Sequence, residues 1–187
     1  MNHDDHVHLI AAGIAHPGGL WADFGAGWGA FTLAMRELTG PEGEILALDR
    51  DWSALGSLRE RMIEQYPGTS LFLIYGDLCH PQEMPPLDGI VAANPLHYVD
   101  RTQQAATLQR WSGLLKPDGC IVLVEYDTSR SSSWLPYPIS FQRLGQIARE
   151  AGLPDPRLLA THPSQWGEGI YSAAMEMITS KSGRQLG

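Results

Sequence analysis

The chain has 187 residues, a length typical of one domain that buries about 70% of its unfolded surface. Hydrophobic residues make up 43% and charged residues 18%, as in ordinary folded proteins. The formal charge of −8 argues against a surface that binds nucleic acid by neutralising phosphates. Cys79 and Cys120 form neither a disulfide framework nor a metal-type C-x-x-C pair, so we expect two buried thiols in one soluble domain spanning 1–187.

The first twenty residues indicate neither a leader nor a membrane anchor. Acids and histidines precede the apolar residues, unlike a signal peptide, and no run approaches the roughly 20 apolar residues of a membrane span. The sequence therefore predicts a cytoplasmic protein without membrane contact. Apolar side chains at helical spacing predict a short helix over 3–14, and we interpret the segment 1–19 as a lid. Its histidines, His3, His6 and His8, are more typical of a solvated terminus than of a metal site, so no metal is expected.

The stretch from Leu20 to Thr32 indicates a buried strand that passes through a glycine-rich turn into a helix. Glycines at 25, 27 and 29 let the backbone turn sharply and approach a ligand, to which the helix start offers N–H groups. Two loops fit this pattern, the D-x-G-x-G-x-G loop and the dinucleotide fingerprint G-x-G-x-x-A, which would end at Ala30. The stretch therefore predicts a nucleotide-cofactor loop and leaves the cofactor open.

The remainder of the chain alternates between apolar runs and amphipathic segments. Further strands are predicted at 43–49, 71–75, 89–93, 120–124, 157–161 and 169–178, and helices at 28–38, 51–66, 103–115 and 141–151, with a tight turn at 117–119 and a frayed tail at 180–187. The pattern predicts a doubly wound, Rossmann-like α/β sheet of seven strands, mostly parallel, with helices on both faces. Because only a loop joins the last two strands, we expect a C-terminal antiparallel hairpin.

Polar side chains follow several of these strands, at the edge where ligands bind in open parallel sheets. Asp49 lies twenty residues after Gly29, the distance at which a carboxylate meets ribose hydroxyls, and we prefer that role to a helix cap. Asp77 is equally consistent with an adenine contact and with a turn. Asn94, His97 and Tyr98 follow the fourth strand, next to the expected reversal of strand order, and Glu125 and Asp127 follow the fifth.

Taken together, these segments resemble the class I S-adenosylmethionine-dependent methyltransferases, in their small, single-domain, type-11-like branch. Five motifs in order carry the resemblance, and they cover most of the chain: 23–29 (DFGAGWG), 48–49 (LD), 76–78 (GDL), 94–98 (NPLHY) and 114–119 (LLKPDG). Asn94-Pro95 is also similar to the N-P-P-Y motif of amino-methyltransferases. Here the aromatic residue comes one place late, at Tyr98, which weakens an amine-methylating interpretation.

The resemblance implies roles for individual residues. Asp23, Gly25 and Gly27 would meet the methionine part of S-adenosylmethionine, Asp49 the ribose, and Asp77 with the Leu78 N–H the adenine, while the Asn94 carbonyl would lie near the sulfonium. The full set of predicted cofactor-binding residues is Asp23, Gly25, Ala26, Gly27, Asp49, Arg50, Gly76, Asp77, Leu78 and Asn94. His97 is the predicted general base because its side-chain pKa is naturally near neutrality, with Tyr98 and Glu125 as further catalytic candidates.

The sequence thus predicts methyl transfer to a small molecule through an oxygen or carbon nucleophile. The loose set of acceptor-site candidates is Trp28, His97, Tyr98, Glu125, Trp134, Tyr137 and Trp166. One alternative is an NAD(P)-dependent reductase, although neither Lys116 nor Lys181 has a tyrosine four residues earlier. Another is a cofactor-binding protein whose pocket is completed by a partner or by a second copy in a homodimer.

Overall fold

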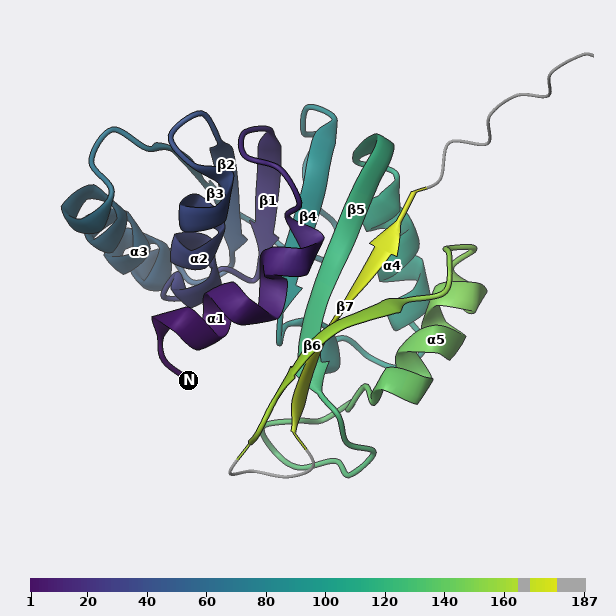
Figure 1. Ribbon diagram of the computed structural model, residues 1–187. Coiled ribbons are helices and arrows are strands. Elements are labelled where there is room, and N and C mark those ends of the chain that lie inside the picture. The colour runs from purple at the N-terminus through teal and green to yellow at the C-terminus, as the bar shows by residue number, and fades with distance from the viewer. Residues whose placement is uncertain (165–168, 178–187) are drawn as a thin grey trace, which may run out of the picture.

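The computed structural model describes residues 1–164 and 169–177, which form a seven-stranded sheet in the order β3-β2-β1-β4-β5-β7-β6 (Figure 1). The strands are β1 (Leu20–Phe24), β2 (Glu44–Asp49), β3 (Ser70–Tyr75), β4 (Leu87–Ala93), β5 (Leu115–Tyr126), β6 (Arg157–His162) and β7 (Ile170–Glu176). The helices are α1 (His3–Ile10), α2 (Ala30–Thr39), α3 (Trp52–Gln65), α4 (Gln104–Ser112) and α5 (Phe141–Glu150), with 3₁₀ turns η1 (Ala11–Gly13) and η2 (Leu96–Tyr98).

Strands β1 to β5 are parallel, and β7 is antiparallel to both of its neighbours, β5 and β6. The doubly wound architecture and the C-terminal hairpin are therefore confirmed. The chain order also reverses at the centre of the sheet, because β1 pairs with β2 on one side and with β4 on the other. The carboxyl ends of β1 and β4 thus border the crevice in which open α/β sheets bind ligands.

Successive side chains of the central strands alternate between two cores. Ala22 and Phe24 face the layer of α4 and α5, where Trp111 is fully buried, whereas Trp21 and Ile45 pack with α1 and α2. A smaller cluster joins α3 to β2. The helices accordingly form two layers, with α1, α2 and α3 on one face and α4 and α5 on the other (Figure 1). Burial on both faces explains why these strands are nearly continuous apolar runs.

The segment that the sequence predicts as a turn at 117–119 is instead part of β5. Leu115 pairs with Leu87 and Cys120 with Gly89, so residues 116–119 lie opposite Asp88 alone and form a large bulge. Asp118 adopts φ 60°, so the local turn geometry that Pro-Asp-Gly favours is present, but pairing with β4 begins before it. The preceding helix correspondingly ends at Ser112 rather than at residue 115.

The N-terminal helix α1 packs on α2 and β6. His3 Nε2 lies 2.7 Å from Glu37 Oε2, and His162 Nε2 lies 3.3 Å from Asp5 Oδ1. The helix begins with a capping box in which Asn2 and Asp5 each accept a hydrogen bond from the other's backbone N–H. Within the described residues, none of the helices combines the length and apolar character that crossing a bilayer requires.

Candidate cofactor and acceptor site

The turn between β1 and α2 depends on three glycines with left-handed backbones. Gly25, Gly27 and Gly29 have φ values of 79°, 50° and 85°, a region that glycine adopts at little cost. A Cβ on Gly25 would lie 2.7 Å from the Cβ of Pro95, and one on Gly29 would lie 2.2 Å from Leu58 Cδ1. A Cβ on Gly27 would meet only a backbone oxygen at 4.0 Å. The loop is therefore packed tightly at both ends and open at its centre.

Asp23, the penultimate residue of β1, comes just before this loop and is 1% exposed. Thr32 Oγ1 donates to Asp23 Oδ2 at 2.6 Å. Burial raises the pKa of Asp23 to about 7, an effect that the Thr32 hydrogen bond opposes and the nearby Asp49 carboxylate adds to. The fold therefore holds the pKa of the Asp23 carboxyl close to neutral pH.

Asp49, at the end of β2, is held by backbone N–H groups. Gly27 N–H donates to Oδ2 at 2.7 Å, and Asp51 N–H donates to Oδ1 at 2.8 Å. Each oxygen of an ionised carboxylate has two acceptor sites, so both remain able to accept a further hydrogen bond. The helix-cap role belongs to Asp51, which accepts from the N–H groups of Ser53 and Ala54 at the start of α3. Asp49 is consequently a fixed carboxylate beside the glycine loop.

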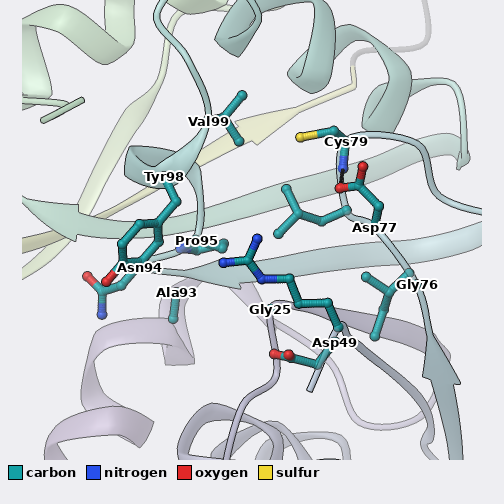
Figure 2. A pocket seen from close by; sticks show the side chains of 13 residues that line it. Gly25, Asp49, Gly76, Asp77, Cys79, Ala93, Asn94, Pro95, Tyr98 and Val99 are labelled. Carbon is teal, nitrogen blue, oxygen red and sulfur yellow. Dashed lines mark hydrogen bonds between the residues drawn. The ribbon is translucent and has the colours of Figure 1, made fainter. Parts of the chain in front are cut away.

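A cavity of about 380 Å³ lies at the carboxyl edge of the sheet, a volume within the usual range of small-molecule sites. Figure 2 shows Asp49 and Asp77 on one side of it and Asn94 and Tyr98 on the other. Its full lining is Gly25, Leu48, Asp49, Arg50, Gly76, Asp77, Leu78, Cys79, Ala93, Asn94, Pro95, Tyr98 and Val99. The loops after β1, β2, β3 and β4 therefore converge on one cavity.

The loop after β3 is held in place by hydrogen bonds from α4 and within the loop itself. Trp111 Nε1 of α4 donates to the Leu78 carbonyl at 2.7 Å. Cys79 N–H donates to Asp77 Oδ1 at 2.9 Å, and this bond is the main cause of the lowered pKa of Asp77. Asp77 therefore presents an ionised carboxylate to the cavity, next to Leu78. Together the two residues offer the polar contacts that a nitrogenous ring needs.

Asn94 is the residue whose local geometry most clearly departs from ordinary packing. It follows β4 with φ 62°, an uncommon value for a residue with a side chain. Its Oδ1 is buried without a hydrogen-bond partner within the described part of the chain. A buried acceptor left unpaired costs roughly 1–3 kcal/mol. An orphaned acceptor and a strained backbone on a cavity wall are both typical of a ligand site.

His97 and Glu125 form a buried pair next to the cavity. Their side chains are 2% and 0% exposed, and His97 Nδ1 lies 2.6 Å from Glu125 Oε2. The His97 backbone N–H also donates to Glu125 Oε1 at 3.2 Å. With Nδ1 bound to a carboxylate, the neutral ring carries its proton on Nδ1 and leaves Nε2 as an acceptor. Glu125 therefore fixes both the position and the tautomer of His97.

The structure brings most, but not all, of the predicted site residues to the cavity. Seven of the ten predicted cofactor residues line it, namely Gly25, Asp49, Arg50, Gly76, Asp77, Leu78 and Asn94, whereas Asp23, Ala26 and Gly27 do not. Of the catalytic candidates, Tyr98 lines it, while His97 and Glu125 lie behind it. None of the lining residues comes from α1, and the lid remains a prediction.

Five lining residues were not among the predicted site residues: Leu48 and Pro95, which belong to the motifs at 48–49 and 94–98, and Cys79, Ala93 and Val99, which no assigned motif position marked, although 76–78 ends just before Cys79. Ala93 and Val99 are ordinary apolar residues, and their only signal was their place beside Asn94 and Tyr98. Cys79 was expected to be buried, but it is only half-buried and lines the cavity, because the loop after β3 turns it outward. Burial and the neighbouring Asp77 raise the pKa of the Cys79 thiol, so it stays protonated at neutral pH.

The remaining acceptor candidates are spread around the rim. Tyr137 N–H donates to the His97 carbonyl at 3.0 Å, and Trp134 packs edge-on against Tyr126. Trp28 is 60% exposed and does not line the cavity. Trp166 and the tail at 180–187 lie outside the described residues. Within 1–164 and 169–177, no cluster of three or more His, Cys, Asp and Glu side chains is placed to hold a metal ion.

Comparison with known families agrees with this geometry. Residues 22–119, more than half of the chain, match the methyltransferase domain family. The chain belongs to the class I S-adenosylmethionine-dependent methyltransferases. This methyltransferase is 31% identical over 123 residues to a carboxy-S-adenosyl-L-methionine synthase of Trichlorobacter lovleyi, which covers 64% of the chain and 49% of that protein. The chain thus spans about half the length of that relative.

Solved methyltransferases share the whole fold at low sequence identity. The 1,6-didemethyltoxoflavin-N1-methyltransferase of Burkholderia thailandensis superposes with a TM-score of 0.74 at 16% identity, over 95% of this chain and 78% of that one. The magnesium protoporphyrin IX methyltransferase of Synechocystis gives 0.69 at 15% identity, over 93% and 77%. The first structure contains S-adenosylhomocysteine and the second S-adenosylmethionine.

The residues of this methyltransferase fit the family's cofactor. S-adenosylmethionine carries ribose hydroxyls, an adenine amine and an ammonium group, and all three are donors. The cavity offers acceptors to match, in Asp49, Asp77 and the orphaned Oδ1 of Asn94. The open side of Gly27 leaves room for a ligand against the backbone. With two carboxylates and one arginine in its lining, the cavity suits this cationic cofactor.

Proposed function

We propose that this protein transfers the methyl group of S-adenosylmethionine to an acidic O–H or C–H group of a small molecule. The observation that supports this most is that one cavity carries the acceptor-rich wall of Asp49 and Asp77 on one side and Tyr98, with the His97–Glu125 pair behind it, on the other. When bound, the cofactor supplies an electrophilic methyl group, so the protein has mainly to position the acceptor and remove its proton.

The cofactor contacts are assigned to the cavity wall and to the glycine loop beside it. Asp49 accepts from the two ribose hydroxyls, because its oxygens keep free acceptor sites beside the bonds to Gly27 and Asp51. Asp77 accepts from the adenine amine, with the Leu78 N–H donating to the ring. The cofactor's methionine part lies along the glycine loop, and its ammonium group pairs with the ionised form of Asp23. Ala26 and Gly76 shape the backbone on either side, and Arg50 covers the mouth.

His97 acts as the general base. Glu125 accepts a hydrogen bond from Nδ1–H, so Nε2 is the nitrogen that can take a proton. It would take the proton of the methyl acceptor as the methyl group moves to that molecule's oxygen or carbon, leaving S-adenosylhomocysteine. Glu125 then stabilises the imidazolium, as the carboxylate of a catalytic triad does. Tyr98 packs on His97 with ring centroids 4.4 Å apart and is 54% exposed. Movement of the Tyr98 side chain therefore opens His97 to the acceptor.

A small acceptor is favoured by the Burkholderia enzyme, whose structure holds 1,6-didemethyltoxoflavin. A homodimer is the partner arrangement we propose to test first. Light scattering during size-exclusion chromatography gives the answer directly. A monomer that turns over would exclude an obligatory partner.

Calorimetric titration with S-adenosylhomocysteine tests the cofactor, with NADH as the parallel control. We expect micromolar binding of S-adenosylhomocysteine and none of NADH. Asp49→Asn should weaken binding by about tenfold or more, because it removes charge-assisted hydrogen bonds to the ribose. Glu42→Gln, at an exposed acid far from the cavity, is the matched control and should bind normally. Binding of NADH in place of S-adenosylhomocysteine would overturn the proposal.

Turnover of the variants tests the base. His97→Gln should lower turnover by about a hundredfold with the affinity for S-adenosylhomocysteine unchanged. Glu125→Gln should lower turnover as well, because its amide donates to Nδ1 and forces the proton onto Nε2. His8→Gln, at an exposed histidine of α1, is the control. Equal losses of turnover and cofactor affinity in His97→Gln would show a structural role instead.

A further inference from the structure

Four ring side chains form a continuous row at the edge of the cavity, His97, Tyr98, Tyr126 and Trp134, which we call the aromatic row. Their centroids lie 4.4 Å apart for His97 and Tyr98, 6.3 Å for His97 and Tyr126, and 5.2 Å for Tyr126 and Trp134. The rings are tilted by 48° to 75°, the geometry in which aromatic groups attract one another. The row begins in the cavity with Tyr98 and ends in the loop after β5 with Trp134.

The two ends of the aromatic row are left open to solvent. Tyr98 is 54% exposed and Trp134 is 41% exposed, although each packs on a neighbouring ring. Burial, followed by the charge of Glu125, raises the pKa of Tyr126, so its ring stays neutral. The row contains no lysine or arginine, and the adjacent Glu125 is fully buried and bonded to His97. The row therefore offers the exposed rings of Tyr98 and Trp134, with the buried His97 between Tyr98 and Tyr126.

We infer that the methyl acceptor is a flat aromatic molecule with a ring hydroxyl, which packs against the aromatic row. This inference rests on the function proposed above. A phenolic hydroxyl titrates near pH 10, whereas an unactivated O–H such as that of water titrates near 15.7, so a histidine removes a phenolic proton far more readily. The phenol's O–H bond breaks and the His97 Nε2–H bond forms, while the phenol oxygen gains the methyl group and S-adenosylhomocysteine is released.

An aromatic acceptor is proposed because a flat ring packs well on the exposed rings of the aromatic row. Ring-on-ring contacts with Tyr98 and Trp134 each favour a planar ligand beyond the area that they bury. A saturated ring of the same size buries similar area but cannot make those contacts. Planarity is therefore the property that a binding experiment should vary.

The test uses 1-naphthol and its saturated counterpart, decahydro-1-naphthol, titrated into the full chain with saturating S-adenosylhomocysteine and followed by NMR. We expect 1-naphthol to bind about tenfold more tightly. Tyr98→Ala and Trp134→Ala should each weaken 1-naphthol binding about threefold to tenfold, and Trp134→Ala, which lies outside the cavity lining, should leave S-adenosylhomocysteine affinity unchanged.

Trp52→Ala is the matched control. Trp52 is 63% exposed and packs edge-on against Tyr75, with centroids 6.1 Å apart, but it does not line the cavity. Its removal should leave 1-naphthol binding unchanged. Equal binding of the planar and saturated compounds, or equal losses in all three variants, would overturn the inference while leaving the proposed function standing. Failure of S-adenosylhomocysteine itself to bind would overturn the proposed function instead.

Discussion

Asp23 should make the stability of this protein depend on pH in a direction opposite to that of most acids. Its pKa is about 7 in the folded chain, against an ordinary value of 3.8. Between these two pH values the native state holds a proton that the unfolded chain has lost, so the free energy of unfolding falls as pH rises. Across pH 5 to pH 8 the loss is about 3 kcal/mol, because each pKa unit corresponds to about 1.36 kcal/mol.

Asp23→Asn isolates this contribution. The amide has the same shape, cannot ionise, and can still accept the Thr32 hydroxyl that lies 2.6 Å from Asp23 Oδ2. Urea unfolding of both proteins from pH 5 to pH 8 gives the difference in free energy, from which other titrating groups cancel. We expect the asparagine variant to gain about 3 kcal/mol relative to wild type over that interval. A difference that stays flat with pH would refute the reasoning, and Glu42→Gln serves as the control.

Three further substitutions test the packing around the site, each by urea unfolding. Gly29→Ala should cost about 2–4 kcal/mol, because its backbone is left-handed and the new methyl would lie 2.2 Å from Leu58 Cδ1. Gly56→Ala should instead stabilise by about 0.5–1 kcal/mol, because it lies inside α3 with nothing within 4 Å of the added methyl; a loss there would contradict the helix. Trp111→Phe should cost about 2 kcal/mol through the lost bond to the Leu78 carbonyl, and an unchanged stability would show that this bond contributes nothing.

The sequence was most informative where local pattern and backbone chemistry coincide. The glycines at 25, 27 and 29 mark a turn that only left-handed backbones can make, and all three adopt that region. Apolar runs of five to seven residues located the strands because both faces of the sheet are covered. The short link between the last two strands likewise required an antiparallel pair, as observed for β6 and β7.

The features that the sequence did not predict depend on contacts between residues far apart in the chain. His97 and Glu125 were each predicted as candidates, but their hydrogen bond joins positions 28 residues apart and depends on the pairing of β4 with β5. The insertion of β7 between β5 and β6 has no local signature, since either order satisfies the hairpin. The bulge opposite Asp88 is similar: Pro-Asp-Gly specifies a turn, and only the partner strand determines that pairing resumes on both sides of it.

The two ends of the loop at 127–140, which joins β5 to α5, lie next to each other. Asp127 Oδ1 accepts the N–H of Phe141 at 2.9 Å, so the two ends of the loop are already joined. Doubling the length of a loop with fixed ends costs only about 0.6 kcal/mol. All residues that line the cavity precede position 100, whereas Trp134 lies inside this loop. Lengthening this segment at its exposed part should therefore cost little stability and leave the residues that line the cavity in place.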